Sequence, residues 1–167
     1  MIARSYILAN LKALDRKFKR ATSEKDTLFY SKLAILELCG WIEESMDDIV
    51  LGCARRHLTE QDNITFVEKQ IVRRTHGFDY DMHFRQMLIQ LLGVINVEKI
   101  EKIVDQGKLM KLRAALDGLK KVRDPEAHTH IKGVTRHIDA PSLTRAQFPA
   151  LYDGLREFHA ALRQVTF

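Results

Sequence analysis

The sequence has few of the residues that interrupt regular structure or cross-link small secreted proteins. Its 167 residues include three prolines, eight glycines and two cysteines. This composition leaves little room for disordered tracts. Cys39 and Cys53 lie fourteen positions apart in an apolar helical pattern, which would separate them by about 21 Å along one helix. An intrachain disulfide is therefore not expected, and we predict two buried, reduced thiols.

Long apolar runs are also absent. Residues 1–20 contain no apolar run of signal-peptide length, and no stretch reaches the roughly eighteen apolar residues of a membrane span. We therefore expect a soluble, cytoplasmic protein. The sequence also lacks a phosphate-cradling glycine-rich loop, a Gly-x-Ser-x-Gly elbow and a protein-kinase motif set. Nucleotide hydrolysis by those routes has no support in the sequence.

The composition is sufficient for one folded domain spanning residues 1–167. Apolar residues make up 46% of the chain and aromatic residues 8%, enough to bury a core in a chain of this length. No segment shows sustained alternation of apolar and polar residues, and no internal repeat is visible. The predicted fold class is all-α, a helical bundle with long core helices and short accessory helices.

Apolar residues recur at spacings of three and four along most of the chain, as in amphipathic helices. Thr22 or Ser23, Asp62 and Asn96 are the predicted N-caps of three helices. The start of the last helix is ambiguous, because Thr144 begins a capping-box pattern whereas Pro149 favours a later start. The predicted helices cover residues 2–18, 28–58, 64–74, 82–92 and 97–104, a segment from residue 109 into the motif described below, and a last helix to about residue 165.

Positive charge is concentrated at the N-terminus. The net charge is +5, and residues 1–25 carry seven Lys or Arg against two Asp or Glu. The rest of the chain carries twenty of each sign. A basic surface of this kind is compatible with a nucleic-acid partner, although a solvated helix face is the commoner explanation.

The stretch 120–130, Lys-Lys-Val-Arg-Asp-Pro-Glu-Ala-His-Thr-His, combines an arginine, two histidines and a helix-start signal. Asp124 followed by Pro125 is typical of an N-cap and the first helical residue. Arg123 would then lie just outside a helix start and His128 on its first turn. The guanidinium and the imidazole could converge near backbone N–H groups that favour an anion. We therefore predict a site that holds a phosphate and moves a proton.

The residues Arg123-Asp124-Pro125-Glu126-Ala127-His128 resemble the motif of the HEPN superfamily. That motif has an arginine, a polar residue and a histidine a few positions later, and this version is most similar to the branch that reads Arg-Asn-x-x-Ala-His. The position late in a helical chain, after a long acidic second helix, agrees with the architecture of that superfamily. The resemblance covers most of the chain only as architecture.

The resemblance implies metal-independent RNA cleavage at a composite site formed by two subunits of a homodimer. Arg123 would grip the scissile phosphate and stabilise the charge that develops on its oxygens. His128 would deprotonate the ribose 2′-hydroxyl or protonate the leaving 5′-oxygen. The expected products carry a 2′,3′-cyclic phosphate and a 5′-hydroxyl. No cofactor is implied. A role as a toxin or defence effector, with an antitoxin as a possible partner, follows from the resemblance alone.

Four further residues are candidates for supporting roles. Asp124 would order the turn as a cap, and His130 would complete the site or contact RNA. Lys120 and Lys121 would contact RNA phosphates. Metal binding by His128 and His130 is not predicted, because no Cys/His pair lies nearby at zinc spacing. Three acidic residues could orient Arg123 through an ion pair if the long helix passes the site, although an exposed acidic face is the simpler explanation: Glu37, Glu43 and Glu44.

Two other readings of the sequence remain. Arg123 and His128 could be structural, with Arg123 in a surface salt bridge and His128 packed under the last helix. The chain would then be a catalytically inert helical module that binds RNA or a protein. Alternatively, a HEPN-like subunit could work with a nucleotidyltransferase partner, with the motif region as the target of modification.

Overall fold

Helices make up the regular structure of the computed structural model, which describes residues 2–127, 130–131 and 137–164. No strand occurs in these residues, and the predicted all-α class is confirmed. In chain order, the elements are α1 (Ser5–Arg20), α2 (Glu24–His57), α3 (Gln61–Phe66), the π-helical segments η1 (Val67–Val72) and η2 (Tyr80–Phe84), α4 (Arg85–Leu92), α5 (Val94–Ile103), α6 (Gln106–Ala127) and α7 (Pro141–Gln164).

Helix α2 is the longest element, with 34 residues, and most of the other elements pack on it. It begins four residues before the predicted range 28–58, and its N-cap is Ser23, one of the two predicted caps. Ser23 Oγ accepts a hydrogen bond from the backbone N–H of Asp26 at 3.1 Å. Cys39 and Cys53 both lie on this helix, and both are buried free thiols. The prediction of two reduced cysteines on one helix is confirmed.

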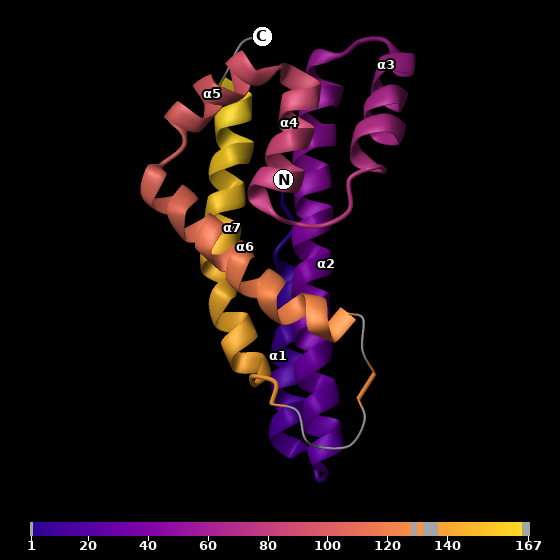
Figure 1. Cartoon of the computed structure of the whole chain (residues 1–167), viewed down its shortest axis with the longest axis vertical. Coiled ribbons are helices and arrows are strands. Elements are labelled where there is room, and N and C mark those ends of the chain that lie inside the picture. The colour runs from indigo at the N-terminus through magenta and orange to yellow at the C-terminus, as the bar shows by residue number, and fades with distance from the viewer. Residues whose placement is uncertain (1, 128–129, 132–136, 165–167) are drawn as a thin grey trace.

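The core lies between α2 and the helices that flank it. Figure 1 shows α1 beside one half of α2, α7 running along the bundle, and α6 crossing obliquely in front. One apolar cluster extends from Ile2 to Leu162. Phe84 and Phe158 are fully buried near its centre, with ring centroids 5.3 Å apart. The C-terminal end of α6 meets the middle of α2, where Arg123 forms an ion pair with Glu43.

The predicted helix start at Asp124 and Pro125 is wrong. Helix α6 continues through both residues and ends at Ala127, so Pro125 lies inside its last turn. Proline deprives one earlier carbonyl of its helical N–H partner, which matters little so close to a helix end. Because Arg123 and Asp124 lie at the C-terminal end of a helix, the anion-binding N–H groups of a helix start are not supplied there.

Other predicted boundaries also differ. Asp62 and Asn96 are not N-caps, since α3 follows Glu60 and α5 follows Gly93. The last helix begins at Pro141, before either predicted start, which uses proline at the first helical position as its fixed φ favours. The spacing of apolar residues therefore predicts which segments are helical more accurately than it predicts where the helices begin and end.

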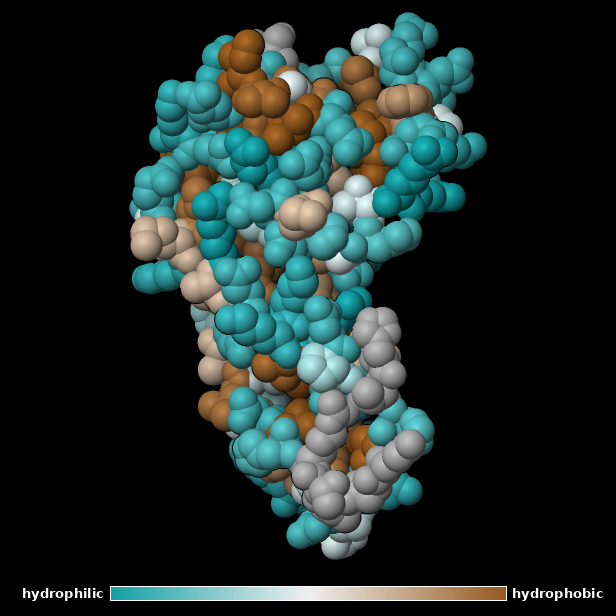
Figure 2. All heavy atoms as spheres, in the orientation of Figure 1, coloured by the Kyte–Doolittle hydropathy of each residue, from teal (hydrophilic) through white to brown (hydrophobic). Residues whose placement is uncertain are grey.

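The surface of the molecule is mainly polar on the face shown in Figure 2. Hydrophilic side chains cover most of the face over α4 and α6. Where α4 passes into α5, Val94 and Ile95 are exposed. Within the described ranges, no helix is both long enough and apolar enough to cross a membrane.

Gly154 allows α7 to pack closely on α6. A Cβ at this position would lie 2.6 Å from Leu112 Cβ, closer than packed side chains permit. We expect Gly154→Ala to lower the free energy of unfolding by about 1–3 kcal/mol, because the two helices would have to separate. Urea denaturation followed by circular dichroism measures this change.

Gly118 provides the matched control, since it is exposed on α6 and has no atom near the position of an added Cβ. Gly118→Ala is expected to raise stability by up to about 1 kcal/mol through helix propensity alone. Equal effects of the two substitutions would contradict the close approach of α6 and α7.

Candidate functional site

A pocket of about 290 Å³ lies at the C-terminal end of α6, where this helix meets the loop before η2. The loop and η2 contribute five of its eight lining residues, and α6 contributes the other three. Two predicted functional residues, Arg123 and Lys120, line it together with predicted support residue Asp124. The full lining is His76, Gly77, Phe78, Asp79, His83, Lys120, Arg123 and Asp124.

Arg123 is held on several sides. Its Nη2 lies 3.5 Å from Glu43 Oε1 on α2, and its Nη1 lies 3.3 Å from Asp124 Oδ1. Its guanidinium is 5.9 Å from the centroid of the Phe78 ring, within the range of a cation–π contact. The side chain is 29% exposed. The guanidinium is therefore positioned by three elements and still reaches the pocket.

Three acidic residues of α2 were candidates to orient Arg123 through an ion pair, and Glu43 is the one that forms it. The other two acidic candidates do not serve Arg123 in this way, since Glu37 accepts a hydrogen bond from Asn10 and Glu44 lines a different pocket. The contact between Arg123 and Asp124 is of the kind expected if Arg123 has a structural role in a surface salt bridge. Both contacts restrict the arginine without using the full set of guanidinium N–H donors.

Lys120 is the second cation of the pocket. Its Nζ lies 3.5 Å from Asp79 Oδ2, which joins α6 to the start of η2. Burial alone would raise the pKa of Asp79, but the backbone N–H of Met82 and the charge of Lys120 outweigh it and lower the pKa below its ordinary value of 3.8. Lys121 is exposed and does not line the pocket.

Two histidines of the pocket, His76 and His83, were not predicted. They lie about forty positions or more before Arg123 in the sequence, and the fold brings them to it. His83 belongs to η2, in which Phe84 N–H bonds to Asp79 O, five residues back. Such π-helical turns are rare and often occur at functional sites. No periodicity in the sequence signals them, although Gly77 and the capping residue Asp79 mark the loop.

Burial raises the pKa of a thiol and of a carboxyl group on α2. Burial raises the pKa of Cys39 to about 12, against a smaller lowering by Arg123. Burial also raises the pKa of Asp47 to about 6, with further contributions from Glu43 and Asp48. Cys39 is therefore a neutral thiol near neutral pH.

Asp47 is expected to make stability depend on pH. Its folded pKa of about 6 is above the ordinary 3.8, so the native state binds this proton more tightly than the unfolded state does. Stability contributed by this group is then lost as pH rises from about 4 to 6. We expect Asp47→Asn to raise stability at pH 7 by roughly 1–3 kcal/mol and to flatten that part of the pH profile. Denaturant unfolding between pH 4 and 7 measures both effects.

Asp117→Asn is the control for this measurement, because Asp117 is exposed on α6 and is not among the groups that raise the pKa of Asp47. It should change stability by less than about 0.5 kcal/mol. A pH profile that Asp47→Asn leaves unchanged would contradict the raised pKa.

The remaining predicted residues are not part of this pocket. His128 lies outside the described residues. His130 is exposed and does not line the pocket. Among the residues that the structure describes, no group of three or more His, Cys, Asp or Glu side chains is arranged to hold a metal ion. Of the predicted pair Arg123 and His128, only Arg123 is among the residues that the structure describes.

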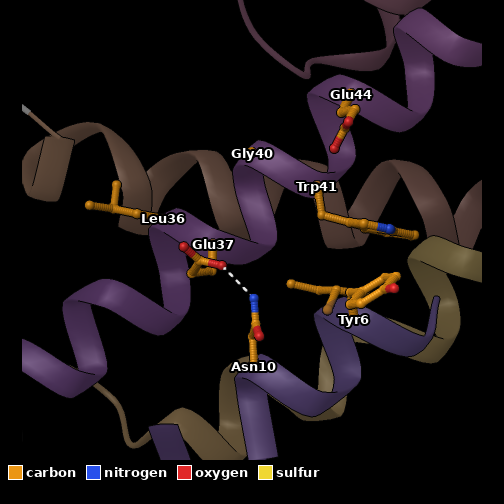
Figure 3. Close-up of a pocket in the computed structure, with 8 residues that line it drawn as sticks. Tyr6, Asn10, Leu36, Glu37, Gly40, Trp41 and Glu44 are labelled. Atoms are coloured by element: carbon orange, nitrogen blue, oxygen red, sulfur yellow. Dashed lines mark hydrogen bonds between the residues drawn. The ribbon is translucent and has the colours of Figure 1, made fainter. Parts of the chain in front are cut away.

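A larger pocket of about 410 Å³ lies elsewhere, between α1 and α2. Figure 3 shows Tyr6 and Asn10 of α1 facing Trp41, Glu37 and Gly40 of α2. Trp41 has a packing role, since the residue is 9% exposed and its Nε1–H donates to the carbonyl of Ala3 at 2.7 Å. This pocket has no histidine, arginine or lysine, and we locate the candidate site at the end of α6.

Comparison with known proteins finds no protein that is similar to this chain. No family model, no curated protein and no solved structure matches the chain. The HEPN resemblance drawn from Arg123 and His128 therefore stays a prediction.

Proposed function

We propose that the protein is a metal-independent endoribonuclease of the HEPN type that acts in the cytoplasm as a toxin or defence effector. Its substrate is RNA, and the attacking group is the ribose 2′-hydroxyl next to the scissile phosphate. Cleavage forms a bond from the 2′-oxygen to phosphorus and breaks the bond to the 5′-oxygen. The products then carry a 2′,3′-cyclic phosphate and a 5′-hydroxyl, with the proton of the 2′-hydroxyl removed by a base and one delivered to the leaving oxygen.

The observation that carries this proposal is the placement of Arg123. Its guanidinium lines the pocket beside Lys120 and is held by Glu43, Asp124 and Phe78. A permanently charged planar group with free N–H donors is suited to the non-bridging oxygens of a phosphate. Fixing it before the substrate arrives reduces the reorganisation needed in the transition state.

His128 is the proposed proton-transfer group, and it follows Arg123 by five positions. Cleavage by this route needs both a base and an acid. A two-fold homodimer would supply one His128 for each role, because an isologous interface brings the same residues of both subunits together. A monomeric preparation with full nuclease activity would contradict the dimeric part of the proposal.

The test is cleavage of single-stranded and transfer RNA by purified protein in EDTA, with His128→Ala in parallel. We expect the wild type to cut and His128→Ala to be slower by about 10²-fold or more. Circular dichroism of both proteins separates loss of chemistry from loss of folding. Undiminished cleavage by folded His128→Ala, or cleavage that stops in EDTA and returns with Mg²⁺, would overturn the proposed mechanism.

The second candidate is a catalytically inert helical module that binds RNA or a protein. The observation that favours it is that Arg123 already has two carboxylate partners. RNA binding by such a module would weaken with salt and survive the loss of His128. Partnership with an antitoxin or a nucleotidyltransferase remains a proposal from the resemblance.

A further inference from the structure

The imidazole of His83 is held in one orientation by the loop that precedes it. The backbone N–H of Asp79 donates to His83 Nδ1 at 3.0 Å. On another side the ring lies against Gly77, where an added Cβ would come within 2.7 Å of His83 Cε1. Gly77 has a φ of 122°, a conformation that glycine adopts at little cost. Because Gly77 has no side chain, the imidazole ring of His83 can occupy this space.

Further contacts fix the segment that carries His83. Asp79 Oδ1 accepts a hydrogen bond from Met82 N–H at 2.8 Å and caps η2. Tyr80 OH donates to Glu101 at 2.7 Å, which ties the same segment to α5. The guanidinium of Arg113 on α6 lies 4.3 Å from the centroid of the Tyr80 ring. His83 is therefore presented to the pocket from a segment anchored to two helices.

The hydrogen bond from Asp79 determines which ring nitrogen carries the proton. A nitrogen that accepts a hydrogen bond has no hydrogen of its own, so neutral His83 carries its proton on Nε2. In this tautomer Nε2–H is a donor and cannot act as a base. A donor of this kind is useful where an oxyanion or phosphate oxygen has to be bound.

The pocket already holds two cations for such an oxygen, Lys120 and Arg123. The carboxylates that face them stand at 3.5 Å for Asp79, 3.3 Å for Asp124 and 3.5 Å for Glu43. These separations are longer than the roughly 2.7–2.9 Å of a good charge-assisted hydrogen bond. A phosphate oxygen hydrogen-bonded to either cation at the usual distance would therefore lie closer to it than these carboxylates do.

We infer that His83 is a phosphate-binding donor, whose Nε2–H contacts a non-bridging oxygen of the RNA phosphate held by Arg123 and Lys120. The identity of the ligand as RNA rests on the proposed function, while the donor role rests on the geometry of the pocket. The role differs from that of His128, because His83 binds the phosphate and does not transfer a proton.

The experiment is histidine ring ¹⁵N NMR of the full chain, titrated with uridine 3′-monophosphate as the probe. We expect the proton of neutral His83 on Nε2 and a shift of that resonance as the probe binds. His83→Ala should weaken binding about tenfold or more. His83→Gln should bind within about threefold of the wild type, because its amide can accept from Asp79 N–H and donate to phosphate. His137 is exposed and lines another pocket. His137→Ala should therefore leave the affinity for the probe unchanged.

A proton on Nδ1, an Nε2 resonance that the probe leaves unmoved, or unchanged affinity in folded His83→Ala would each overturn the inference. If His83→Ala does not fold, the wild-type tautomer and titration still decide. RNA cleavage by the same preparations separates this inference from the proposed function. Phosphate binding that depends on His83 without any cleavage would refute the ribonuclease alone. Cleavage by wild type that is equally fast in His83→Ala would refute the role of His83 alone.

Discussion

Replacing Arg123 with alanine is expected to slow RNA cleavage by about 10³-fold, because an arginine that stabilises charge on a transferring phosphate contributes effects of this size. The structure explains why no neighbour should compensate. Lys120 lines the same pocket, but a lysine offers a point charge in place of a planar fork. Single-turnover cleavage of an end-labelled RNA measures the change without interference from product release.

Two variants control this prediction. Arg123→Lys retains the charge and loses the fork, so its rate should lie between those of the wild type and Arg123→Ala. Arg163→Ala removes an exposed arginine of α7 and should leave the rate unchanged. A rate for folded Arg123→Ala within a few-fold of the wild type would leave the arginine with only its ion pairs to Glu43 and Asp124, and the inert binding module would be favoured.

Replacing Phe158 with alanine is expected to lower the free energy of unfolding by about 3–5 kcal/mol, as for other fully buried phenylalanines. The ring is fully buried, with its centroid 5.3 Å from that of Phe84 and 5.6 Å from that of Tyr80. Both partners belong to η2, so the cavity would form directly beneath the segment that carries His83. Chemical denaturation measures the loss, which is a large share of the roughly 5–15 kcal/mol of a typical domain.

Phe66 is the matched control, since its side chain is 59% exposed at the end of α3. Phe66→Ala should alter stability by no more than about 0.5 kcal/mol. If Phe158→Ala changed the free energy of unfolding as little as Phe66→Ala, the aromatic contacts between α7 and η2 would not stabilise η2 at the site.

The helices of this fold are largely predictable because their apolar positions repeat with the helical period. The cap at Ser23 and the two buried cysteines of α2 follow from local signals of the same kind. Asp124 and Pro125 were misread because Asp-Pro has two physical interpretations. It can start a helix, or it can lie in a last turn, where the missing N–H matters little. Local sequence does not distinguish these cases, whereas the packing of α6 does.

The candidate site was predictable only in the part that lies close together in the sequence. Arg123 and Lys120 line one pocket, and Glu43 of α2 forms an ion pair with Arg123. His76 and His83 reach the pocket through the turn of the chain between η1 and α4. That turn depends on π-helical hydrogen bonds and tertiary contacts, which have no periodic signature in the sequence.

The most direct test of the account uses two RNA oligonucleotides that differ in one atom. After the cut position is mapped with wild-type protein in EDTA, the same oligonucleotide is made with a single 2′-deoxyribose on the 5′ side of that position. The account predicts that cleavage there disappears, while the all-ribose RNA yields a 2′,3′-cyclic phosphate and a 5′-hydroxyl. Equal cleavage of both oligonucleotides would contradict attack by the 2′-hydroxyl, and with it the proposed chemistry of Arg123 and His128.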